Sequence, residues 1–96
     1  TGSDFNFVLL SVTEGEDKPL KYPGIFRKTQ SAIITKVDIA DVVECDINLI
    51  KNNIRQINPD SVIFETSAKK NIGIEELANF IIKYHSNKYD GTIKKN

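Results

Sequence analysis

Residues Phe7 to Val12 are apolar at nearly every position, and this unalternating run is the feature that most constrains the fold. A strand with one face in water alternates apolar and polar residues, whereas a strand covered on both faces, as in a parallel sheet, does not. Similar short segments occur at 31–35 and 61–65. Because parallel strands need crossover connections, helices should lie between them. The sequence therefore predicts an α/β fold with a three-stranded parallel sheet.

A valine and four isoleucines recur at intervals of three and four between the second and third of these segments. That spacing forms one apolar stripe and predicts a helix over 46–57, with Asp46 as its N-cap. The other predicted elements are a helix over 23–28, a last helix from Ile74 to about Tyr84, a long loop over 13–22 and a frayed tail over 88–96.

Right-handed crossovers that step in one direction put both connecting helices on the same face of the sheet. Apolar side chains such as Phe7 and Leu9 would then stay uncovered on the other face. We therefore expect residues 1–96 to be a single partial domain, half of a doubly wound domain. Its uncovered face would be buried by the missing half or by a second copy of the chain.

Thirteen Lys and Arg residues balance thirteen Asp and Glu residues, so no overall attraction to nucleic acid or to an anionic membrane is expected. The longest apolar run is far shorter than a membrane span, and the first residues show no signal-peptide pattern. One cysteine, Cys45, excludes an internal disulfide and is interpreted as a packing residue. These features predict a cytoplasmic protein that binds neither nucleic acid nor membranes.

Thr35, Lys36 and Asp38 stand where the second predicted strand ends, at the sheet edge where α/β folds bind ligands. A carboxylate there can accept two parallel hydrogen bonds from N1 and the 2-amino group of guanine, while a lysine stem lies across the ring. Taken alone, the pattern is better explained as a solvated loop.

Ser67, Ala68 and Lys69 follow the third predicted strand at the same edge. Small residues there let backbone N–H groups approach the carbonyl oxygen of a base. Alone, this segment too is better explained as a serine turn before a helix. Because both segments end adjacent parallel strands, together they predict a binding site for a guanine nucleotide.

The two segments resemble the fourth and fifth motifs of P-loop GTPases, which are Asn or Thr-Lys-x-Asp and Ser-Ala-Lys. Residues 11–23, Ser-Val-Thr-Glu-Gly-Glu-Asp-Lys-Pro-Leu-Lys-Tyr-Pro, closely resemble a segment of the hydrogenase nickel-incorporation GTPases, relatives of the urease nickel-insertion GTPases. The resemblance extends from about Phe5 to Tyr84. It implies GTP or GDP as ligand, hydrogenase maturation proteins as partners, and coupling of GTP hydrolysis to nickel insertion.

The sequence lacks the family's phosphate-binding loop, Gly-x-x-x-x-Gly-Lys-Ser/Thr, its upstream acidic Mg²⁺ motif and its paired Cys and His. The resemblance places these elements N-terminal to this region, so the chain resembles the C-terminal half of such a GTPase. It implies that the Mg²⁺ and nickel ligands lie elsewhere, and we assign no catalytic residue and no metal ligand. Hydrolysis by this chain alone is not expected, because nothing in it would offset the triphosphate charge.

Two alternatives concern residues outside the guanine motifs. Glu14, Glu16 and Asp17 could bind a metal through oxygen, although a clustered acidic loop is usually only solvated. The chain could also be a non-catalytic interaction module that dimerises through the uncovered face and the loop from Lys18 to Pro23. Guanine nucleotide binding separates this alternative from the leading hypothesis.

Overall fold

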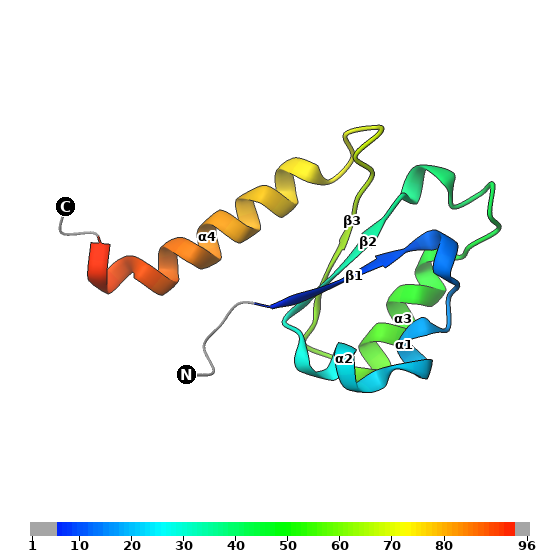
Figure 1. Ribbon diagram of the computed structural model, residues 1–96, viewed down its shortest axis with the longest axis horizontal. Coiled ribbons are helices and arrows are strands. Elements are labelled where there is room, and N and C mark those ends of the chain that lie inside the picture. Colours follow the sequence, from blue (N-terminus) through cyan, green and yellow to red (C-terminus); the bar gives the residue numbers. More distant parts are fainter. Residues whose placement is uncertain (1–5, 94–96) are drawn as a thin grey trace.

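The computed structural model describes the backbone of residues 6–93 and the side chains of residues 6–84, and it forms one layered α/β unit (Figure 1). The strands are β1 (Phe7–Ser11), β2 (Ser31–Thr35) and β3 (Val62–Glu65). The helices are α1 (Lys18–Lys21), α2 (Pro23–Lys28), α3 (Ile47–Ile57) and α4 (Ile74–Ile93), and two 3-10 turns, η1 (Val12–Glu14) and η2 (Val37–Ile39), follow β1 and β2.

The sheet is parallel throughout, in the order β1-β2-β3, which confirms the predicted fold class. Its lateral rows include Phe7–Ser31–Val62 and Leu9–Ile33–Phe64. The carboxyl ends of β2 and β3 therefore lie side by side, and so do the segments that follow them.

The core lies between the sheet and helices α2 and α3, which are on the same side of it (Figure 1). Leu10 and Ile34 point from the sheet to Ile50 and Ile54 of α3, and all four side chains are fully buried. The predicted helix over 46–57 is confirmed, with the Asp46 carboxylate accepting from the Leu49 N–H as an N-cap. The predicted isoleucine stripe thus supplies this core.

The opposite face of the sheet is covered only in part, by α4 (Figure 1). The Phe80 ring of α4 contacts the Phe64 ring of β3 with centroids 4.9 Å apart. In the same lateral row Ile33 is 2% exposed, whereas Leu9 on the edge strand β1 is 56% exposed. The expectation of an uncovered face therefore holds at β1 and is corrected at β3.

Two predicted segments differ from the structure. The predicted long loop over 13–22 overlaps the turn η1, which a capping box of Ser11 and Glu14 stabilises, and it contains the helix α1. The last helix extends to Ile93, so the predicted tail over 88–96 begins within it, and residues 94–96 lie outside the described part. No helix in the described residues has the length and apolarity needed to cross a bilayer.

We expect the chain to self-associate through the β1 side of this face, and Leu9→Lys to favour the monomer. Burial of apolar surface contributes about 25 cal/mol per Å², which a lysine at the centre of the contact would remove. Sedimentation velocity over a wide concentration range measures the effect. Val42→Lys is the control, since Val42 is 79% exposed and lies outside the sheet. Equal association of the Leu9 variant and the unmodified chain would contradict the prediction.

Candidate functional site

The segments that follow β2 and β3 enclose one cavity of about 400 Å³ at the carboxyl edge of the sheet. Its lining residues are Lys36, Asp38, Ile39, Ser67, Ala68 and Lys69. Five of the six residues predicted from the sequence thus lie together. Thr35 is the last residue of β2 and is not part of the lining. Ile39 is a lining residue that the sequence analysis missed, because nothing distinguishes it from an ordinary packing residue.

Lys36 adopts the left-handed conformation, with φ 61°, directly after β2. For a residue with a Cβ this conformation costs about 1–2 kcal/mol, so neighbouring contacts must hold it. The next residue, Val37, donates its N–H to the carbonyl of Thr66 at 3.1 Å. Thr66 in turn donates its N–H and its hydroxyl to the carbonyl of Ile34, at 2.7 and 3.0 Å. Buried Thr66 therefore ties the two loops together.

The Ser67 hydroxyl holds the Asp38 carboxylate in the cavity. Its Oγ accepts from the N–H of Lys70 at 3.1 Å and donates to Asp38 Oδ1 at 2.6 Å. The Ser67 hydrogen bond lowers the pKa of the Asp38 carboxyl below its ordinary value of 3.8; desolvation opposes this, and the charges of Lys69 and Lys70 add to it. Asp38 is therefore a charged acceptor at neutral pH.

We expect Ser67→Ala to raise the pKa of Asp38 towards its ordinary value, because the main cause of the lowering is removed. Because the pKa of Asp38 is lower in the folded state, its ionisation stabilises the protein at pH values above the ordinary pKa. This stabilisation is lost as the pH falls through the lowered pKa of the folded state. The variant should lose that contribution. Carboxyl ¹³C NMR titration measures the change. Ser61→Ala is the matched control, since the buried Ser61 hydroxyl makes no hydrogen bond in the described residues. An unchanged Asp38 titration in the Ser67 variant would contradict the assignment.

The loop after β3 is closed on itself. Ser67 and Ile72 exchange two backbone hydrogen bonds of 3.0 and 2.9 Å, and Asn71 donates its N–H to the Ala68 carbonyl at 3.3 Å. Within the described part of the chain, the N–H groups of Ala68 and Lys69 donate to no protein acceptor. The cavity thus combines a carboxylate acceptor with two available backbone donors and the side chains of two lysines.

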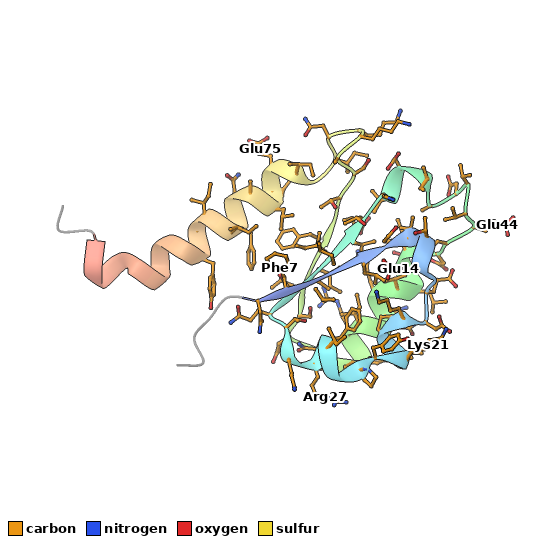
Figure 2. All side chains as sticks on the ribbon, in the orientation of Figure 1. Phe7, Glu14, Lys21, Arg27, Glu44 and Glu75 are labelled. Atoms are coloured by element: carbon orange, nitrogen blue, oxygen red, sulfur yellow. The ribbon has the colours of Figure 1, made fainter. Side chains whose placement is uncertain are left out.

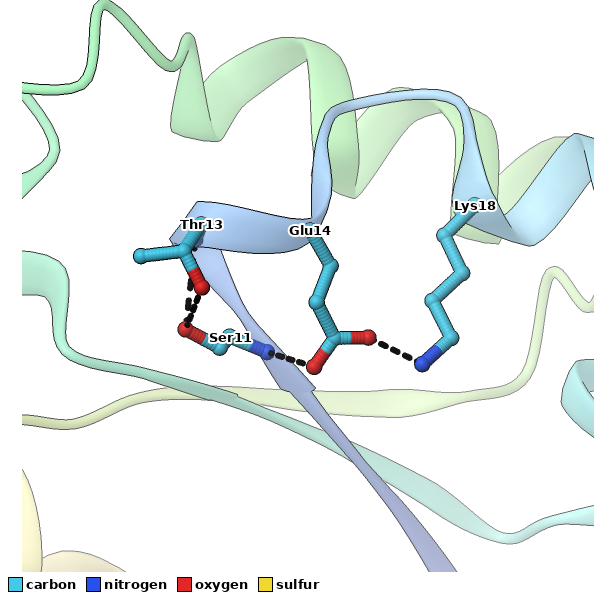
Figure 3. Close-up of polar contacts among 4 residues, drawn as sticks. All are labelled: Ser11, Thr13, Glu14 and Lys18. Atoms are coloured by element: carbon cyan, nitrogen blue, oxygen red, sulfur yellow. Dashed lines mark hydrogen bonds and ion pairs between the residues drawn. The ribbon is translucent and has the colours of Figure 1, made fainter.

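The long segment after β1 is held by its own contacts and by α3. The Ser11 N–H donates to the Glu14 carboxylate, which also pairs with Lys18, and the Ser11 hydroxyl accepts from the Thr13 N–H (Figure 3). The second carboxylate, Glu16, accepts from the Asp46 N–H at 2.6 Å. These acidic side chains have structural partners.

No three His, Cys, Asp or Glu side chains come close enough to hold a metal ion in the described residues. Burial raises the pKa of the Cys45 thiol, and the nearby carboxylates of Glu16 and Asp46 add to this. Cys45 is therefore a thiol at neutral pH, as expected for a packing residue.

The sequence matches the family model PduV-EutP, described as "Ethanolamine utilisation - propanediol utilisation", over residues 3–83. It is also 35% identical over 91 residues to the hydrogenase/urease maturation factor HypB of Helicobacter pylori, covering 95% of this chain and 38% of that protein. A probable hydrogenase maturation factor HypB of Methanocaldococcus jannaschii is 37% identical over 82 residues, covering 85% of this chain and 37% of that protein. The chain thus spans less than two fifths of these relatives.

Two crystal structures share its fold. HypB from Helicobacter pylori, solved in complex with nickel, superposes with a TM-score of 0.82 at 35% identity, covering 88% of this chain and 40% of that one. The hydrogenase maturation factor HypB from Archaeoglobus fulgidus gives a TM-score of 0.80 at 36% identity, covering 83% and 39%. The three-stranded unit is therefore part of a P-loop GTPase fold. The chain belongs to the PduV-EutP family and is homologous to part of the hydrogenase maturation factors HypB.

Proposed function

We propose that this chain is the guanine-recognition half of a GTP-binding protein that acts in nickel insertion during hydrogenase maturation. The single observation that carries the proposal is the convergence of Asp38 and Ser67–Lys69 on one cavity, with Ser67 bonded to Asp38. The names of the relatives support a role in hydrogenase maturation, and the name of the Helicobacter pylori protein refers to urease maturation as well.

The proposed contacts follow from the chemistry of the lining. The Asp38 carboxylate accepts from N1 and the 2-amino group of guanine, a pair that adenine lacks. The N–H groups of Ala68 and Lys69 are the donors for the base carbonyl oxygen, since they have no protein acceptor in the described residues. The stem of Lys36 covers one ring face. Thr35 contributes as the end of the strand from which this loop starts.

The family description names ethanolamine and propanediol utilisation, whereas the relatives are named for hydrogenase maturation. We base the proposed process on the relatives, because the Helicobacter pylori protein is matched over 95% of this chain at 35% identity. The described residues do not fit a nickel or Mg²⁺ site. Those ions are therefore assigned to none of the described residues, and no catalytic step is derived from them.

Amide NMR titration of the chain with GDP and with ADP tests the base specificity. We expect saturable shifts at Lys36, Asp38 and Ser67–Lys69 with GDP, and at least about tenfold weaker binding of ADP, because two hydrogen bonds to Asp38 are missing. A second titration with guanosine tests whether the base is bound in the absence of the phosphates. Equal affinity for GDP and ADP, or shifts confined to other residues, would refute guanine recognition.

A non-catalytic dimerisation module is the second candidate, favoured by the 56% exposure of Leu9 on the sheet and the 54% exposure of Tyr22 after α1. It predicts association of the chain without any response to GDP. The GDP titration separates the two functions, because association through Leu9 is expected for both.

A further inference from the structure

The outer edge of β3 carries unpaired backbone groups. Val62 and Thr66 donate their N–H groups to carbonyls of the β2 segment, at 3.1 and 2.7 Å. Because residues alternate along a strand, Ile63 and Glu65 direct their backbone groups away from β2. No partner for these groups is present among the described residues. Gly73 packs closely on the Glu65 carbonyl, so the available groups are the N–H and C=O of Ile63 and the N–H of Glu65.

A groove of about 420 Å³ runs beside this edge. Its lining residues are Ile63, Phe64, Glu65, Ile72, Gly73 and Glu76. Ile72, at the end of the loop after β3, is 44% exposed. An apolar groove beside a free strand edge is the geometry by which proteins bind an extended peptide as an additional strand.

The two charged residues that line the groove, Glu65 and Glu76, are both acidic. Glu75 and Glu76 stand in the first turn of α4, and Glu75 projects outward at its start (Figure 2). Glu65 is paired with Lys51 at 2.8 Å, whereas the two glutamates of α4 form no ion pair among the described residues and can attract a ligand. We propose that the outer edge of β3 binds an extended segment of a partner protein that carries lysine or arginine, by strand addition.

A second copy of this chain fits the edge less well. β3 itself, Val62–Glu65, carries no lysine or arginine, so the β3 edge of a second copy would bring no positive charge to Glu75 and Glu76. A basic segment instead places opposite charges there. Charge complementarity therefore favours a basic segment of a partner protein over a second copy of this chain.

The groove and the cavity with Asp38 lie on either side of one backbone bridge. Ile72 lines the groove, Ser67 lines the cavity, and the two residues exchange both of their backbone hydrogen bonds. A segment docked on β3 would therefore contact the loop that positions the Ser67 hydroxyl.

A short, capped peptide of alternating valine and lysine is the probe, titrated into the ¹⁵N-labelled chain. We expect saturable shifts at Ile63, Glu65 and Ile72, and slower hydrogen exchange of the Ile63 and Glu65 amides. The same peptide N-methylated at alternate residues keeps its charge but cannot form the ladder, so it should bind about tenfold more weakly. A valine–glutamate peptide should not bind.

Glu75→Lys with Glu76→Lys should weaken binding of the lysine peptide about tenfold, since two opposite charges become like charges. The matched control is Asp41→Lys with Asp60→Lys, which changes the net charge equally at exposed positions outside the groove. Equal binding of the N-methylated peptide, equal binding of the glutamate peptide, or shifts that omit Ile63 and Glu65 would each overturn the proposal. If hydrogen exchange of the Ile63 and Glu65 amides slowed as the chain concentration rose without any peptide, a second copy would be the occupant. That result would also overturn the proposal.

Discussion

Replacing Asp38 by asparagine should reverse the base preference of the chain from guanine to xanthine. The Ser67 hydroxyl can donate to the amide oxygen as it does to Asp38 Oδ1, at 2.6 Å, so the side chain keeps its place in the cavity. The amide nitrogen then presents a donor where the carboxylate presented an acceptor. Guanine loses its 2-amino contact, whereas the 2-oxo group of xanthine gains one.

An unmatched polar group typically costs about 1–3 kcal/mol, or about one to two decades of affinity. We therefore expect the GDP:XDP affinity ratio to change by at least that factor in Asp38→Asn, measured by titration of both nucleotides. Lys36→Ala should weaken both nucleotides equally, because its stem packs on a ring face that the bases share. Asp41→Asn is the matched control, since Asp41 is exposed and outside the cavity lining. An unchanged ratio in Asp38→Asn would remove Asp38 from the base site.

Gly73→Ala should destabilise the chain strongly, because a Cβ at this position would lie 2.1 Å from the carbonyl oxygen of Glu65. Gly73 also has a φ of +68°, which disfavours any residue with a side chain. The left-handed conformation costs about 1–2 kcal/mol and the backbone shift about 1–3 kcal/mol, so we expect a loss of about 2–5 kcal/mol. For a domain of this size, that lowers Tm by about 10 °C or more.

Gly24→Ala is the matched control for this prediction. A Cβ there meets nothing within 4 Å, and Gly24 lies inside the helix α2, where alanine is preferred by about 0.5–1 kcal/mol. Urea unfolding of both variants should therefore show changes of opposite sign. If Gly73→Ala were no less stable than Gly24→Ala, the contact between Gly73 and the end of β3 would not constrain the loop.

The loop contacts explain why the site was only partly predictable. The motif residues Lys36, Asp38, Ser67 and Lys69 were found because their types and their places after strands are visible in the sequence. Thr66, which joins the two loops, carries no such signal, since a threonine at the end of a strand is common. Ser11 with Glu14 did carry one, because Ser-x-x-Glu is the pattern of a capping box, and it predicts the turn that the long-loop interpretation missed.

The sequence by itself determined the layer arrangement. The unalternating strands and the isoleucine stripe of α3 predict a parallel sheet with crossover helices, and crossovers that step in one direction place α2 and α3 on one face, because burial and chain connectivity act over short, periodic patterns. Only the tertiary structure decided the left-handed Lys36, the Ser67–Asp38 bond, the packing of Gly73 on Glu65 and the coverage of β3 but not β1 by α4. The first two depend on contacts between segments about thirty residues apart, and the last two depend on how the loop after β3 folds back and on the angle at which α4 leaves the sheet. No local sequence pattern encodes such contacts.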